Sequence, residues 1–228
     1  PNTMNRPNFT LWTESQVKRL TLAGGSGGSG DANGNGPLRC TGAEMVRGGQ
    51  TVTVTATREV VLCAGSIGSP QILQLSGIGP AALLQNHGIT PALDLPGVGA
   101  NLQDHLQIRC AWQVSGIGTL NERAGTLLGK AKIGIEYLLK RTGPMAMAPS
   151  QLGMFTRSHA HLSTPNLEYH VQPLSLAAFG GDLDPFPAFT ASVCNLRPNS
   201  RGSVSIPSAN PADAPLIRPN YLSDPGDV

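Results

Sequence analysis

Residues 58–79 read REVVLCAGSIGSPQILQLSGIG. The apolar run from Glu59 to Ala64 predicts a strand covered on both faces. A glycine-containing turn follows, and Ser69 and Pro70 suit the N-cap and the first position of a short helix, Gln71 to Leu75. Because glycines let a backbone approach a ligand closely, and a helix N-terminus offers free N–H groups to an anion, the pattern is typical of nucleotide binding. Many strand–turn–helix junctions bind nothing. This pattern alone is therefore also consistent with a turn that has only a structural role.

The residues before this stretch predict a small sheet. The segment from Phe9 to Leu22 has the alternation of an extended strand, with Val17 among its inward-facing positions. Arg39 to Val46 and Thr51 to Thr57 follow as two strands joined by a tight glycine turn. Glycines and small polar residues fill positions 24–36, which predicts a flexible insertion in a loop of this sheet.

The residues after this stretch predict helices followed by a mainly antiparallel sheet. A short helix is expected from Pro80 to about Gly88, which suits the position after a helix C-terminus, and a longer helix from Gly129 to Arg141. Strands are expected at Leu167 to Val171, Phe189 to Leu196 and Ser203 to Ile206, with residues 199–202 as a hairpin turn between the last two.

Composition excludes several classes of protein. The 228 residues are 39% apolar, which is enough for a buried core, and the net charge of +2 argues against nucleic-acid binding. No apolar run is long enough for a transmembrane segment. Cys40, Cys63, Cys110 and Cys194 lie far apart and form no CxxC pair, so neither a metal site nor a redox dithiol is expected. Cys63 is expected to be a small buried apolar residue.

Residues 65–79 also carry a resemblance. GSIGSPQILQLSGIG matches every position of the second signature of the glucose–methanol–choline (GMC) oxidoreductases. The flanking strand at 58–65, the loop at 95–105, and the segments at 197–204 and 219–222 resemble the same family. The resemblance covers nearly the whole chain except the glycine-rich stretch.

The resemblance implies an α/β fold in two parts. Residues 1–105 would form part of a parallel-sheet FAD-binding domain. Residues 106–228 would form part of an antiparallel-sheet substrate domain and the start of the family's C-terminal region. The family's GxGxxG loop is expected before Pro1 and its catalytic histidine after Val228, so no catalytic residue is assigned to this chain.

The same resemblance implies the residues that meet the cofactor. Val17 would contact the adenine of FAD through its backbone, although a valine that simply fills the core would look the same. Ala64, Gly65 and Ser66 would line the flavin-nucleotide side, where lack of bulk lets the cofactor approach, or would form a tight packing turn. Asn101 lies in a loop expected near the flavin, and bonding of its side chain to loop backbone is an equal alternative.

The implied activity is oxidation of a primary alcohol by hydride transfer to FAD. Its partners would be a small-molecule alcohol and an electron acceptor, either oxygen, a quinone or another carrier. A flavin-fold lyase of the hydroxynitrile-lyase type is the alternative within the family. A third interpretation is that residues 1–228 alone are a non-catalytic module. His159 and His161 form an HxH pair without a third ligand at suitable spacing, so no metal is predicted.

Overall fold

The computed structural model describes residues 2–24, 37–148, 150–178 and 180–228. The chain forms two compact units, the first made of Pro1–Gln103 with Ser200–Ser223, and the second of Asp104–Asn199 with Asp224–Val228. The predicted flexible insertion at 24–36 lies outside the described residues except for Gly24.

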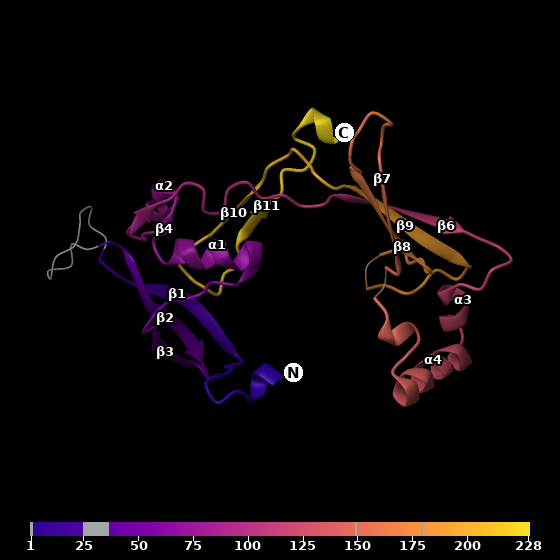
Figure 1. Cartoon of the computed structure of the whole chain (residues 1–228), viewed down its shortest axis with the longest axis horizontal. Helices are drawn as coiled ribbons and strands as arrows, with labels where there is room; N and C mark the ends of the chain where they lie inside the picture. The colour runs from indigo at the N-terminus through magenta and orange to yellow at the C-terminus, as the bar shows by residue number, and fades with distance from the viewer. Residues whose placement is uncertain (1, 25–36, 149, 179) are drawn as a thin grey trace. The chain divides into compact units, whose positions relative to one another are not determined.

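Unit 1 begins with a three-stranded antiparallel sheet in the order β1-β2-β3 (Figure 1). The strands are β1 (Ser15–Ala23), β2 (Arg39–Arg47) and β3 (Gln50–Thr55). Gly48 and Gly49 join β2 to β3, and both have left-handed backbones with φ of 56° and 77°. Two consecutive residues with positive φ are what a two-residue hairpin turn requires. The predicted glycine turn is therefore confirmed.

The segment before α1 (Gly65–Leu75) differs from the sequence prediction. Residues 59–64 are not a strand: they pair with none of the described strands, the Val61 side chain is 72% exposed, and Cys63 is exposed rather than buried. An apolar run becomes a buried strand only where neighbouring strands cover it. The described part of the chain provides no such neighbours.

The start of α1 was also predicted wrongly. The helix begins at Gly65, so Ser69 and Pro70 lie inside it and Ala64 is the N-cap. The Ser69 hydroxyl accepts a hydrogen bond from the Ala64 N–H at 3.2 Å, which satisfies a donor at the helix start from within the helix. Pro70 is the sixth residue of α1, so its missing N–H costs the helix one bond, the one that would reach the carbonyl of Ser66.

A small β–α–β element follows α1. It consists of β4 (Ile78–Gly79), α2 (Ala81–Asn86) and β5 (Leu93–Asp94), and β4 pairs with β5 in parallel. Gly88 has a φ of 71° and closes α2: its N–H donates to Gln85 O, and the Ile89 N–H donates to Leu84 O. These two bonds form a Schellman motif, which confirms Gly88 as the residue after the helix C-cap. Ile89 then packs against the apolar cluster of Leu75, Leu84 and Ile206.

The returning segment 200–223 adds β10 (Ser203–Ser205) and β11 (Leu216–Arg218), an antiparallel pair, to unit 1. The predicted hairpin at 199–202 is wrong, because β10 does not pair with the strand before it. That strand, β9 (Ala188–Asn195), is already bonded to a neighbour along each of its two edges. The chain at 199–202 therefore leaves one sheet for another.

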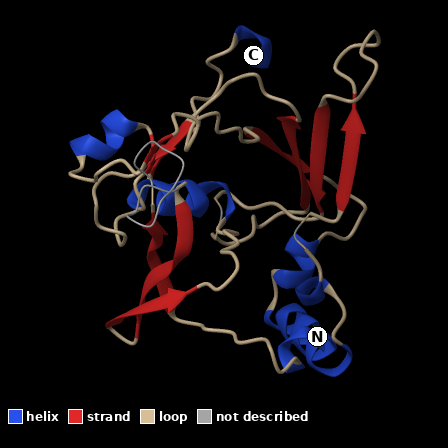
Figure 2. Cartoon of the chain, turned by 60° about the vertical axis from the view of Figure 1, so that its left-hand side comes forward, coloured by secondary structure: helices blue, strands red, loops and turns tan. Residues whose placement is uncertain are grey.

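Unit 2 is built on a four-stranded antiparallel sheet, visible among the strands of Figure 2. It contains β6 (Gln107–Gln113), β7 (Leu152–Thr156), β8 (Leu167–Gln172) and β9, in the order β6-β9-β8-β7. Along β9 buried and half-buried residues alternate, as expected for a strand with one covered face. Two helices, α3 (Leu120–Ala124) and α4 (Leu127–Lys140), lie between β6 and β7 in the chain. The predicted helix and both strands in this region are confirmed.

The fold is thus mixed α/β, with a parallel strand pair and antiparallel sheets, which confirms the predicted class. Short 3-10 helices complete the elements at Asn2–Asn5, Pro144–Ala146 and Pro225–Asp227. None of the helices in the described ranges combines the length and apolar content that a bilayer crossing requires.

Candidate functional site

The turn that starts α1 is an open backbone corner. Ala64, Gly65 and Ser66 are all exposed, and Gly65 has a φ of 75°. A Cβ atom added at Gly65 would meet no atom within 4 Å, so backbone conformation rather than crowding within the chain requires glycine here. The first turn of α1 contains no acidic residue. Its N–H groups and the positive end of the helix dipole can therefore receive an anionic group.

Val17 lies in β1, half-buried and opposite Met45 of β2. The pairing register shifts between Val17 and Arg19, which is a bulge that disturbs the ladder at Lys18. Because β1 is an edge strand, its second row of backbone groups faces away from β2. On that side the Leu20 N–H donates to the Ser76 hydroxyl at 2.8 Å, which ties β1 to the end of α1. The backbone groups of Val17 thus lie at a strand edge, where they can form hydrogen bonds with a planar ligand.

Asn101 lies in the loop after β5 and is exposed. Its φ is 59°, a left-handed conformation that asparagine adopts more easily than most residues. The next residue, Leu102, exchanges two backbone hydrogen bonds with Gly202, at 3.0 and 2.8 Å. The backbone conformation alone therefore accounts for an asparagine at this position. The structure places Val17, Asn101 and the Gly65 turn in one compact unit, on three different elements.

A cavity of about 830 Å³ lies in unit 1 at the other end of α1. It is lined by part of β1, by Leu75, Ser76 and Gly77, and by the loop after α2. Because α1 has 11 residues, this end lies roughly 15 Å from the Gly65 turn. The cavity is therefore separate from the corner that the sequence pattern identified.

Glu44 is a charged group at the edge of this cavity. Its carboxylate lies 2.7 Å from Lys18 Nζ and 3.0 Å from an Arg19 nitrogen. Hydrogen bonds from Lys18 and then Arg19 lower the pKa of Glu44 below its ordinary value. The group is thus held as an anion.

The buried side chain of Gln74 was missed by the sequence analysis. Its amide nitrogen donates to Val98 O at 3.2 Å and to Val204 O at 3.1 Å, and its amide oxygen accepts from the Ile206 N–H at 2.9 Å. Gln74 thereby fixes α1, and with it the corner, to two other segments. The only signal in the sequence is a polar residue between Leu73 and Leu75, which does not distinguish a buried glutamine from an exposed one.

Comparison with known proteins gives the family. A family profile described as GMC oxidoreductase matches residues 1–107. The oxygen-dependent choline dehydrogenase of Brucella ovis is 42% identical over 224 residues, which cover 98% of this chain.

The chain belongs to the GMC oxidoreductase family. The corresponding enzyme of Stenotrophomonas maltophilia is 37% identical over 97% of the chain. Residues 1–228 span 38% of the length of the Brucella ovis relative and 37% of the Stenotrophomonas one.

Solved structures of GMC-type enzymes agree with the fold. A formate oxidase aligns with 98% of this chain and 42% of its own, at 25% identity and a TM-score of 0.80. A variant of the Aspergillus oryzae formate oxidase, described for its FAD modification, aligns at 26% identity with a TM-score of 0.79. The alignment again covers 98% of this chain and 42% of the other. Pyridoxine 4-oxidase from Mesorbium loti aligns at 25% identity with a TM-score of 0.72. The alignment covers 97% of this chain and 37% of the pyridoxine 4-oxidase chain. The predicted family, and FAD as the cofactor of that family, are confirmed.

Proposed function

We propose that this chain forms one wall of the FAD site in an enzyme that oxidises a primary alcohol. Residues 1–105 would serve the cofactor and residues 106–228 the substrate. The observation that carries the proposal is the Gly65 turn, where a glycine with positive φ and exposed neighbours opens the start of a helix. Such a corner suits a dinucleotide, which needs close backbone approach and N–H donors.

The chain's own residues would bind and orient the cofactor. Ala64, Gly65 and Ser66 present small side chains and backbone toward the flavin-nucleotide part, while the edge backbone of Val17 would bond the adenine. Asn101 would approach the flavin from the loop after β5. FAD, when bound, supplies the acceptor for a hydride. No histidine of residues 1–228 is assigned the role of taking the hydroxyl proton.

The proposed substrate class is a small primary alcohol. The relatives named as choline dehydrogenases and pyridoxine 4-oxidase support it, because choline carries a primary alcohol and the 4-position of pyridoxine a hydroxymethyl group. Choline itself is not proposed. Its cationic head favours an aromatic cage, and the chain has two tryptophans, of which Trp12 already stacks against Arg47 at 4.7 Å. Oxygen, a quinone or another carrier would accept the electrons.

Anaerobic reduction of the flavin tests this proposal. The full-length protein is mixed with aliphatic and aromatic primary alcohols and with choline, and its flavin absorbance is followed. Bleaching by at least one alcohol is expected. An oxidised spectrum that no alcohol changes, while dithionite still reduces the flavin, would contradict the proposal. Nothing in the Gly65 corner favours the lyase over the oxidoreductase, and the relatives and structures named above are dehydrogenases or oxidases.

A further inference from the structure

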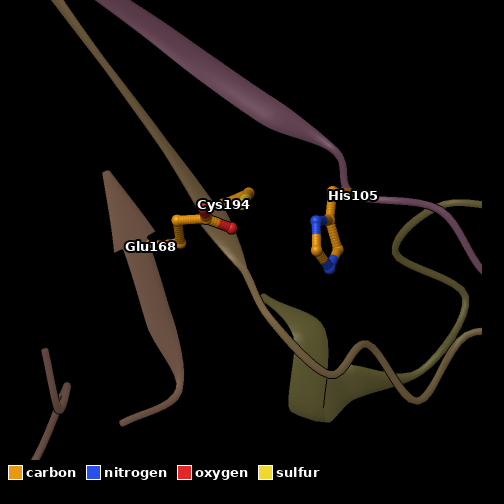
Figure 3. A group of neighbouring side chains, drawn as sticks. All are labelled: His105, Glu168 and Cys194. Carbon is orange, nitrogen blue, oxygen red and sulfur yellow. The ribbon is translucent and has the colours of Figure 1, made fainter. Parts of the chain in front are cut away.

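Three side chains that carry possible metal-ligand atoms lie close together at one end of the unit 2 sheet. In the sheet register Cys194 of β9 stands directly opposite Glu168 of β8 on one side and Gln107 of β6 on the other. Directly paired residues point their side chains to the same face of a sheet. His105 precedes Gln107 by two residues, and its ring lies beside the Glu168–Cys194 pair (Figure 3). One donor atom from each of His105, Glu168 and Cys194 lies within 4.8 Å of the others.

The hydrogen bonding of His105 leaves a ring nitrogen available. Its Nε2 lies 3.0 Å from the carbonyl oxygen of Leu196. A carbonyl only accepts hydrogen bonds, so the neutral ring must carry its proton on Nε2 and keep the lone pair on Nδ1. Histidines that bind metals commonly donate their other N–H to a backbone carbonyl in this way. Figure 3 shows one ring nitrogen turned toward Glu168 and Cys194 and the other pointing away.

We propose that His105, Glu168 and Cys194 form a binding site for a divalent metal ion of the zinc type. Imidazole, carboxylate and thiolate are the three ligand types that Zn²⁺ takes in proteins, and three protein ligands leave a fourth position for water. Metal–ligand distances of roughly 2.0–2.3 Å place tetrahedral donors about 3.5 Å apart, so the three atoms need to close by little more than ~1 Å. His105 is exposed and can make that movement, and its exposure also gives the ion a path from solvent.

The surroundings of the three ligands support this site. His170 Nε2 lies 3.3 Å from one oxygen of Glu168, which orients the carboxylate and leaves its second oxygen for the ion. Cys194 is 2% exposed. Burial raises the pKa of its thiol, and the charge of Glu168 raises it further. Both effects oppose the thiolate, so an ion that binds here must displace the thiol proton.

Metal titration of the full-length protein, without an affinity tag and after treatment with a chelator, tests the site. Zn²⁺ is titrated by calorimetry, and Co²⁺ is added separately because its absorption reports thiolate coordination. We expect one equivalent of Zn²⁺ and a Co²⁺–thiolate absorption band. His105→Gln and Cys194→Ser should each weaken Zn²⁺ binding by about 100-fold or more, and His170→Gln by about tenfold. Cys110→Ser is the matched control, because Cys110 is an exposed cysteine on the neighbouring strand β6, and its binding should equal that of the parent protein.

Two results would overturn the site: no stoichiometric Zn²⁺ binding, or binding as tight in His105→Gln as in the parent. If Cys194→Ser fails to fold, His105→Gln decides, because an exposed side chain can be replaced without loss of packing. Flavin content and reduction by alcohols are measured on the same samples. They test the proposed function separately, since the metal site uses none of the residues assigned to FAD.

Discussion

The carboxylate of Glu44 forms salt bridges with two cations of β1, Lys18 and Arg19. The pKa of Glu44 is lowered, chiefly by the hydrogen bond from Lys18. The pairing therefore stabilises the fold fully above the ordinary pKa of 4.5, and this stabilisation is lost as the pH falls through the lowered pKa. We expect Glu44→Gln to lower the thermal midpoint slightly at pH 7, because exposed pairs contribute little, and to lower it by less at pH 3. A difference in midpoint that is equal at both pH values would contradict this account of Glu44.

Single residues were predictable where one local rule decides their role. Gly48, Gly49 and Gly88 occupy left-handed backbone positions, and the sequence indicated all three as turn or cap glycines. Cys63 and Ser69 were predicted wrongly because their environments depend on neighbours. The exposure of Cys63 follows from the absence of a covering strand among the described residues, and Ser69 bonds Ala64 from inside a helix that begins earlier than expected.

At the scale of elements, Gln74 joins α1 to β10 and to the loop after β5. Its side chain is 1% exposed and bonds three backbone groups. Gln74→Ala would leave those groups buried without partners, and we expect a loss of about 3 kcal/mol or more in the free energy of unfolding. Gln71→Ala is the control, since Gln71 makes one such bond, to Asp213 O, and should cost about 1 kcal/mol. Equal losses in the two variants, measured by urea unfolding, would show that the network is unimportant.

The sequence predicted elements better than their pairing. The strands β2, β8 and β9 and the helix α4 follow from alternation and helical spacing, which are local properties. The predicted hairpin at 199–202 was wrong because pairing depends on which strand edges are already occupied. The cluster of His105, Glu168 and Cys194 was likewise invisible in the sequence, since strand register rather than spacing brings it together.

At the scale of the whole molecule, α4 carries an exposed apolar stripe. Leu128, Ile135 and Leu139 repeat at helical spacing and are 66%, 55% and 78% exposed. We expect residues 1–228 expressed alone to self-associate and to bind an apolar dye. Replacing Leu128 and Leu139 together by lysine should reduce both effects, whereas Ala131→Lys, which adds charge without removing a large apolar side chain, should reduce them less. A monomer that binds no dye would contradict this expectation.

The family and the α/β class were predictable from one continuous signature, because residues 65–79 carry it without any long-range information. The return of residues 200–223 to unit 1 was not predictable in the same way. It depends on contacts such as those of Gln74 with Val204 and Ile206, which join residues more than a hundred positions apart.

The most direct measurement is the affinity of the full-length protein for FAD in two glycine variants, Gly65→Ala and Gly88→Ala. Both glycines have a similar positive φ, 75° and 71°, and an added Cβ would meet no atom within 4 Å at either position. The two substitutions therefore impose similar backbone strain, of about 1 kcal/mol. If the Gly65 backbone lies against the cofactor, Gly65→Ala weakens FAD binding by about tenfold or more while Gly88→Ala leaves it unchanged. Equal FAD affinity in the two variants would contradict the proposed cofactor site.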